Sequence, residues 1–187
     1  MEKSEIIQKE IIEKIESWNE ILKKNELKST KFKGAMTSEF IKRYLEEEGF
    51  NVSNRDSFIE GVPNEIDLMI LKKDAKQIFN SYYKPEDVLA VFEIKYWGSY
   101  GKSTIESLRK MLAHVKRINP KIKRIYLTLA ERIDSKNRIK TEDIQDINGK
   151  VFELFLVKND IHASQKNGTL ESEATGDWKK LIDYLKG

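Results

Sequence analysis

Three charged residues stand inside apolar segments of the chain, where a charge is costly to bury. Asp67 lies in the segment NEIDLMIL, and Glu93 and Lys95 lie in the segment DVLAVFEIKYWG. If the second segment is a strand, Glu93 and Lys95 project from one face, because side chains two residues apart on a strand do so. A carboxylate buried without a partner is unfavourable, so the pattern predicts that these charges meet a cation or a donor.

Two carboxylates on neighbouring strands, with an ammonium group beside them, suit a hard divalent ion such as Mg²⁺. The ion would be held by Asp67, Glu93, a backbone carbonyl, here that of Ile94, and waters. It would polarise a phosphate oxygen and acidify the attacking water, while Lys95 orients or deprotonates that water. Glu65 shares the strand face of Asp67, where it either assists the metal or forms a surface charge at the strand edge. The chemistry that this pattern favours is phosphodiester hydrolysis.

The elements that position these residues follow from hydrophobic periodicity. The spacing predicts, in order, helices at 3–25 and 35–48, strands at 50–54, 56–60, 65–73 and 88–96, a helix at 103–118, strands at 122–131 and 151–158, and a helix at 177–186. Residues 74–87 form a polar and aromatic connection that is too long for a tight hairpin. The Ser-, Gly- and Asn-rich stretch 160–176 predicts a flexible loop.

The first helix carries an unusually broad apolar surface. One stripe is spaced by three or four residues, and three more isoleucines widen it: Ile7, Ile11, Ile15, Trp18 and Leu22, with Ile6, Ile12 and Ile21. Such a surface is either covered by the rest of the domain or used against another subunit. Residues 1–28 are therefore an N-terminal helix and a candidate dimerisation element.

The length and composition predict one α/β (α+β) domain over residues 1–187. A chain of this size with 39% hydrophobic residues can bury a substantial core. We divide the domain into the N-terminal helix, a catalytic core at 34–160, and a loop with a C-terminal helix at 161–187. A mixed sheet that receives helices from both ends of the chain fits this order of elements.

Composition also excludes several classes of function. The chain has no cysteine and two distant histidines, His114 and His162, so thiolate chemistry is excluded and any metal would be held by oxygens. No apolar run approaches the roughly 20 residues of a membrane span, and the start lacks the apolar block of a signal peptide. We therefore expect a cytoplasmic protein without a membrane partner.

With Glu39 on the helix before these strands, the set Asp67, Glu93 and Lys95 resembles the PD-(D/E)xK nuclease superfamily, the restriction-endonuclease-like proteins. The resemblance runs from about Gly34 to Leu129, and it departs from the family pattern in having Ile66, not proline, before Asp67. Pro63 lies four positions before Asp67.

The resemblance implies a restriction-endonuclease-like core, a central mixed β-sheet flanked by helices. It further implies Mg²⁺-dependent endonuclease cleavage of duplex or branched DNA, with Mn²⁺ as a substitute, no small-molecule cofactor, and a homodimer. The implied catalytic set is Asp67, Glu93, Lys95 and Glu39, and the implied metal ligands are Asp67, Glu93, Ile94 and Glu39. Glu39 has an alternative role as a first-turn acid favoured by the helix dipole.

The mild net charge of +3 permits a polyanionic partner without requiring one. The candidate nucleic-acid contacts are the aromatic and basic residues that follow the Glu-x-Lys strand and the densest basic cluster: Trp97, Tyr100 and Lys102, with Lys116, Arg117, Lys121, Lys123 and Arg124. These residues equally fit a core edge, a helix cap and a solvated helix end. A protein that keeps the fold and binds nucleic acid or another protein without hydrolysis is the alternative function.

Overall fold

The computed structural model describes residues 30–97, 102–132, 139–157 and 172–187, and scattered positions between 6 and 25. At the edges of some of these ranges the description extends to the backbone alone. The account below concerns these residues.

A six-stranded sheet forms the centre of the fold, in the order β1-β3-β6-β7-β8-β9. Its strands are β1 (Asn51–Val52), β3 (Leu68–Leu71), β6 (Val88–Trp97), β7 (Lys123–Arg132), β8 (Gly149–Val157) and β9 (Ser172–Ala174). The three central strands β6, β7 and β8 run parallel, while β1, β3 and β9 pair antiparallel with their neighbours. The sheet is therefore mixed, as the sequence predicted.

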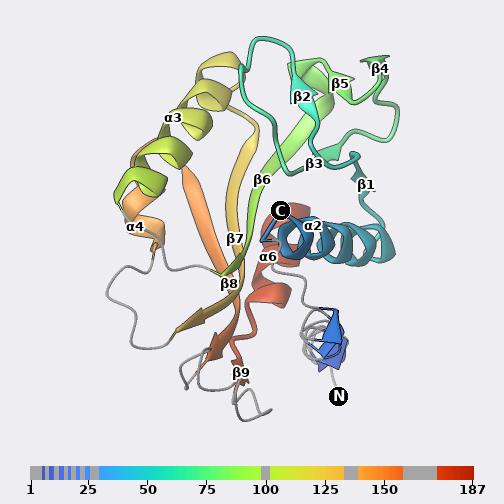
Figure 1. Cartoon of the computed structure of the whole chain (residues 1–187). Coiled ribbons are helices and arrows are strands. Elements are labelled where there is room, and N and C mark those ends of the chain that lie inside the picture. The colour runs from blue at the N-terminus through green and yellow to red at the C-terminus, as the bar shows by residue number, and fades with distance from the viewer. Residues whose placement is uncertain are drawn as a thin grey trace.

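Helices cover both faces of this sheet (Figure 1). On one side lie α2 (Thr30–Glu47) and α6 (Asp177–Lys186), and on the other lie α3 (Lys102–Ile118), the short α4 (Thr141–Ile144) and the 3₁₀ turn η2 (Gln145–Ile147). The alternation of side chains along β6 divides the core between these layers. Phe92 and Ile94 pack in the cluster that contains α2 and α6, whereas Val91 packs in the cluster that contains α3.

The predicted helices form because each buries one apolar stripe. In α3 the buried residues Leu108, Leu112 and Val115 follow the expected spacing of three or four. Helix α2 begins earlier than predicted and is closed by Gly49, whose positive φ of 89° and N–H bond to the Glu46 carbonyl (2.9 Å) form a C-terminal cap.

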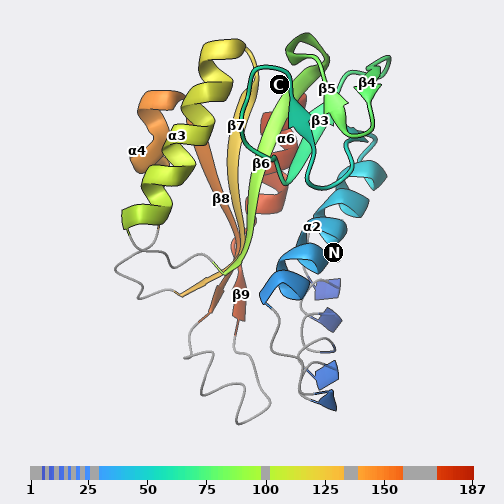
Figure 2. The same cartoon turned by 45° about the horizontal axis from the view of Figure 1, so that its top comes forward.

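A second, three-stranded sheet lies beyond the β3 side of the main sheet (Figure 2). It has the order β2-β5-β4, with β2 at Phe58–Ile59, β4 at Gln77–Phe79 and β5 at Tyr82–Tyr83, followed by the 3₁₀ turn η1 at Pro85–Asp87. Residues 74–87 do connect β3 to β6, but they also contain a short hairpin of β4 and β5 that the sequence pattern did not predict. The third strand that supports it, β2, is distant in sequence, so local periodicity could not reveal the pairing.

At the two ends of the chain, the predictions can be compared with the structure only at the described residues. Within the predicted loop at 160–176, strand β9 pairs with β8, and residues 158–171 lie outside the described residues. The described positions between 6 and 24 are helical, but Ile7, Ile11, Ile12, Ile15, Trp18 and Leu22 fall outside them. In the described part of the chain, no helix has the length and apolar character needed to cross a membrane.

Candidate active site

Asp67 and Glu93 come together where β3 and β6 part. Leu68 and Phe92 are the last pair of the β3–β6 ladder, and Asp67 and Glu93 are the next residues on the two chains. There the Asp67 side chain provides a hydrogen-bond acceptor in place of a strand carbonyl, because Asp67 Oδ2 accepts a hydrogen bond from the backbone N–H of Ile94 (2.6 Å). The end of the ladder therefore fixes the Asp67 carboxylate against the Glu-x-Lys strand.

Lys95 lies beside Glu93, as the period of two along β6 predicts. The Lys95 Nζ atom and the Glu93 Oε1 atom form an ion pair, and both side chains are partly buried. Partial burial strengthens the attraction between the two groups relative to a pair in bulk water. Glu93 thus has an ammonium neighbour on its own strand and a carboxylate neighbour on the next.

The position of Asp67 next to Glu93 affects the pKa of Asp67. Burial, reinforced by the negative charge of Glu93, raises the pKa of Asp67 from its usual 3.8 to about 6, although the Ile94 N–H and Lys95 oppose the shift. At neutral pH Asp67 is ionised in a place where desolvation and a second carboxylate disfavour its charge. A bound cation would relieve that cost.

A cavity of about 550 Å³ opens beside these groups. It lies between β6, α3 and the segment that joins β2 to β3. Its lining combines the charged pair with apolar and polar side chains from these elements: Phe58, Pro63, Asn64, Glu65, Glu93, Lys95, Ser107, Leu108, Met111 and Tyr126. Glu65 is exposed and lines this cavity together with Glu93, a position that is compatible with both of its predicted roles.

Asp56 lies opposite Asp67 on the segment before β2, and nothing in its sequence context singled it out. Ser57 and Ile66 exchange backbone hydrogen bonds of 3.1 and 2.9 Å, which sets Asp56 opposite Asp67. Asp56 has a positive φ of 53° and pairs with Arg55 (2.8 Å). Only the tertiary bridge between two irregular segments brings this carboxylate close, so periodicity gave no signal for it.

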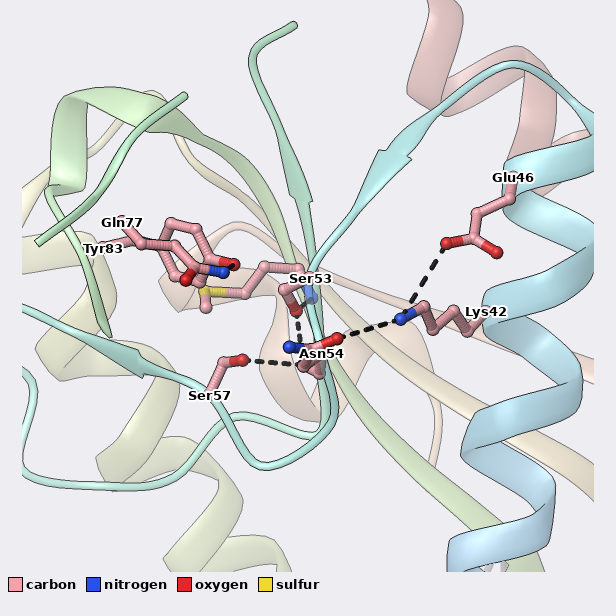
Figure 3. Close-up of polar contacts among 8 residues, drawn as sticks. Lys42, Glu46, Ser53, Asn54, Ser57, Gln77 and Tyr83 are labelled. Atoms are coloured by element: carbon pink, nitrogen blue, oxygen red, sulfur yellow. Dashed lines mark hydrogen bonds and ion pairs between the residues drawn. The ribbon is translucent and has the colours of Figure 1, made fainter. Parts of the chain in front are cut away.

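The loop that carries Asp56 is held by a small polar network (Figure 3). Ser53 and Ser57 both donate hydrogen bonds to the Asn54 carbonyl (2.8 and 2.7 Å), and Ser53 Oγ accepts one from the buried N–H of Met69 (2.9 Å). Lys42 of α2 donates to the Asn54 side chain (3.2 Å). The network ties the loop to β3 and to α2 close to Asp67.

The structure does not bring Glu39 to this group. Its side chain is exposed on α2, which packs on the opposite face of the sheet from Lys95. Across the described residues, no three acidic, histidine or cysteine side chains gather as a metal site of that size requires. The carboxylates that meet are Glu93 on β6 and Asp67 immediately before β3.

The basic cluster at 116–124 is only partly available to a polyanion. The prediction for Arg124 is wrong, since this side chain is 2% exposed and donates to the Pro120 carbonyl (3.3 Å). Burial also lowers the pKa of Arg124. Arg117 and Lys121 are exposed and remain candidates.

Two lysines of the same cluster serve as contacts within the fold. Lys123 donates to the carbonyls of Tyr184 and Leu185 (2.6 and 3.2 Å) near the C-terminus of α6, a position that favours a cation. Lys116 donates to the Asp146 carbonyl (2.8 Å).

The aromatic and basic residues after β6 are untested. Trp97 ends that strand and Lys102 begins α3, but their side chains are not described, and Tyr100 lies outside the described residues.

The chain has a restriction-endonuclease-like fold, in which a mixed sheet lies between two helical layers. In this fold Asp67 faces the Glu-x-Lys strand. Comparison with solved structures finds NucC of E. coli MS115-1 in its cAAA-bound form, with a TM-score of 0.63 at 14% identity, over 100% of this chain and 90% of that one. NucC of P. aeruginosa ATCC27853, also cAAA-bound, gives a TM-score of 0.60 at 14% identity, over 100% and 91%. No family model and no curated protein sequence matches the chain. The likeness establishes the fold.

Proposed function

We propose that this chain is a metal-dependent endonuclease that hydrolyses phosphodiester bonds in DNA. The observation that carries the proposal is the convergence of Glu93 and Lys95 on β6 with Asp67, immediately before β3, beside a cavity in a nuclease-like fold. In a protein that only binds nucleic acid, two carboxylates at the place where phosphate must approach would weaken the binding by repulsion.

The donor set fits Mg²⁺, with Mn²⁺ as a substitute. Asp67 and Glu93 would hold the ion, with the Ile94 carbonyl and waters completing its oxygen shell. The raised pKa of Asp67 is the observation that favours a cation here. When bound, the ion supplies Lewis-acid polarisation of the phosphate and a more acidic water. We leave Glu39 out of this set because its side chain is exposed on α2, which packs against the other face of the sheet.

The side chains of the chain itself supply the remaining chemistry. The ammonium group of Lys95 is paired with Glu93, and this side chain lines the cavity. There it can orient the attacking water and counter the charge that develops on the phosphorus oxygens. The cavity next to Lys95 gives the phosphate a place to enter.

The partners we propose are duplex or branched DNA and a second copy of the chain. Arg117 and Lys121 are the exposed members of the basic cluster that could contact phosphates. For the homodimer, the described part of the N-terminal helix offers Ile6 and Ile21, which are 42% and 50% exposed. Exposed isoleucines on a helix suit an apolar interface between copies.

The test is a cleavage assay on supercoiled, linear and branched DNA, with Mg²⁺, with Mn²⁺ or with EDTA. Because both NucC structures are cAAA-bound forms, each arm is run with and without cAAA. We expect metal-dependent cleavage that Lys95→Ala lowers by about 100-fold or more, the usual contribution of a positioned acid-base or electrostatic group.

The matched control is Lys73→Ala, which removes an exposed lysine and should cleave like the wild type. Equal activity of Lys95→Ala, or cleavage that survives EDTA, would contradict the mechanism. DNA binding without cleavage in every arm would favour the non-hydrolytic alternative.

A further inference from the structure

A row of three polar side chains crosses the centre of the sheet from the candidate active site. Lys95 on β6 is in register with Thr128 on β7, and Thr128 is in register with Glu153 on β8. The sequence neighbours of Thr128, Leu127 and Leu129, belong to the core on the α2 and α6 side. By alternation Thr128 therefore points to the other side, the side of Lys95 and Glu153.

The hydroxyl of Thr128 is anomalous within this row. Thr128 is 1% exposed, and its Oγ1 atom has no hydrogen-bond partner among the described residues. Buried polar atoms are nearly always paired, because an unpaired one keeps its desolvation penalty. Valine would fill the same β-branched shape on a strand without that penalty, so packing alone does not account for a threonine here.

The neighbours of Thr128 indicate what the hydroxyl could bind. Its register partner on β6 is Lys95, which carries an ammonium group, and its register partner on β8 is Glu153, a carboxylate residue that is 7% exposed. A hydroxyl can accept from the first and donate to the second. In the present arrangement the Lys95 ammonium is paired with Glu93, the residue that would carry the metal.

We propose that Thr128 is a positioning residue that receives the Lys95 ammonium when a divalent cation takes the Glu93 carboxylate. The hydroxyl then accepts a hydrogen bond from Lys95 and holds the ammonium beside the cavity. Thr128 touches neither the metal nor the phosphate. This inference rests on the proposed function, because it needs the metal to compete with Lys95 for Glu93.

The test is a double-mutant cycle on Mg²⁺ affinity, measured by titration calorimetry on the full chain without DNA. The four proteins are the wild type, Thr128→Val, Lys95→Met and the double variant. We expect Thr128→Val to weaken Mg²⁺ binding by about fivefold when Lys95 is present, which is the worth of one ordinary hydrogen bond. In the Lys95→Met background we expect the same substitution to change affinity by less than about twofold, since no ammonium remains to be received.

Thr128→Ser is the matched control, because it keeps the hydroxyl and removes only a methyl group. It should bind Mg²⁺ like the wild type, and in cleavage assays Thr128→Val should lower kcat while leaving KM for DNA unchanged. An equal loss of affinity in both Lys95 backgrounds, or a loss in Thr128→Ser as large as in Thr128→Val, would show a packing role and overturn the proposal. A wild type that binds no Mg²⁺ would instead overturn the proposed function on which it rests.

Discussion

At the scale of single residues, the site depends on the Asp67 carboxylate, which replaces a strand partner for the backbone of β6. Asp67 supplies the acceptor for the Ile94 N–H at the point where β3 stops pairing with β6. The same replacement buries Asp67 next to Glu93 and raises its pKa to about 6. The charge that a metal would need is thus held in the fold at the expense of stability.

A pH dependence of stability follows from that pKa. Because the pKa of Asp67 is raised on folding, its contribution to stability is fully present below about pH 3.8 and is lost as the pH rises through about 6. In EDTA, Asp67→Asn should remove this loss and be more stable than the wild type at pH 7.5. The difference in the free energy of unfolding between variant and wild type should be larger at pH 7.5 than at pH 3.5, by up to about 3 kcal/mol. Urea denaturation at both pH values measures it.

The control for this prediction is Asp74→Asn, which alters an exposed carboxylate away from the pair. Its effect on the free energy of unfolding should be small at both pH values, because surface charges contribute little to stability. A wild type and Asp67→Asn variant whose stability difference is the same at both pH values would show that Asp67 is not perturbed by burial.

At the scale of elements, the loop between β1 and β2 is the support of the site. It carries Asp56 next to Asp67 and leads into Phe58, which lines the cavity. The strands at its two ends, β1 and β2, are short. Side-chain hydrogen bonds therefore have a large share in holding the loop in place. Ser53 is central, since it accepts from the Met69 N–H in the buried strand β3.

We therefore expect Ser53→Ala to destabilise the protein by about 1–3 kcal/mol, the cost of leaving a buried N–H without its acceptor. Thermal denaturation measures the loss, and hydrogen exchange should show faster exchange at the Met69 amide in particular. Lys42→Ala removes an exposed contact of the same network and should cost less than about 0.5 kcal/mol. If the two variants were equally stable, the serine would not be the support that the geometry indicates.

At the scale of the whole molecule, the N-terminal helix and α2 are joined by specific contacts. Tyr44 donates a hydrogen bond to Glu10 (2.7 Å), and Lys14 lies over the Phe40 ring (5.1 Å). Burial and the Glu10 carboxylate raise the pKa of Tyr44 to about 12. Part of this helix is thus used within the chain, while Ile6 and Ile21 are exposed, as the proposed contact with a second copy requires.

An assembly through that surface can be tested without touching the candidate site. Ile6 and Ile21 lie about 60° apart around an ideal helix, so one interface can cover both. We expect the double variant Ile6→Glu/Ile21→Glu to shift the chain from dimer to monomer in sedimentation analysis, with an unchanged melting temperature of the monomeric fold at low concentration. Exposed Glu13→Gln on the same helix is the control. A wild type that sediments as a monomer at every concentration would exclude the homodimer.

The sequence by itself determined the main elements and the central part of the site. Hydrophobic periodicity is a local property, so it predicted α3, β6 and β7 closely, and the period of two placed Glu93 and Lys95 on one face. The apolar setting of Asp67 predicted that its charge has a partner. These features depend on residues a few positions apart, which is the range over which a sequence pattern has meaning.

Only the tertiary structure decided what lies beside those residues. The end of the β3–β6 ladder gave Asp67 its backbone donor, a bridge between two loops added Asp56, and the β7 register set Thr128 next to Lys95. The same packing placed Glu39 on the far face and buried Arg124. Such placements depend on strand order and on which helix covers which face, and these are fixed by long-range packing that no local period encodes.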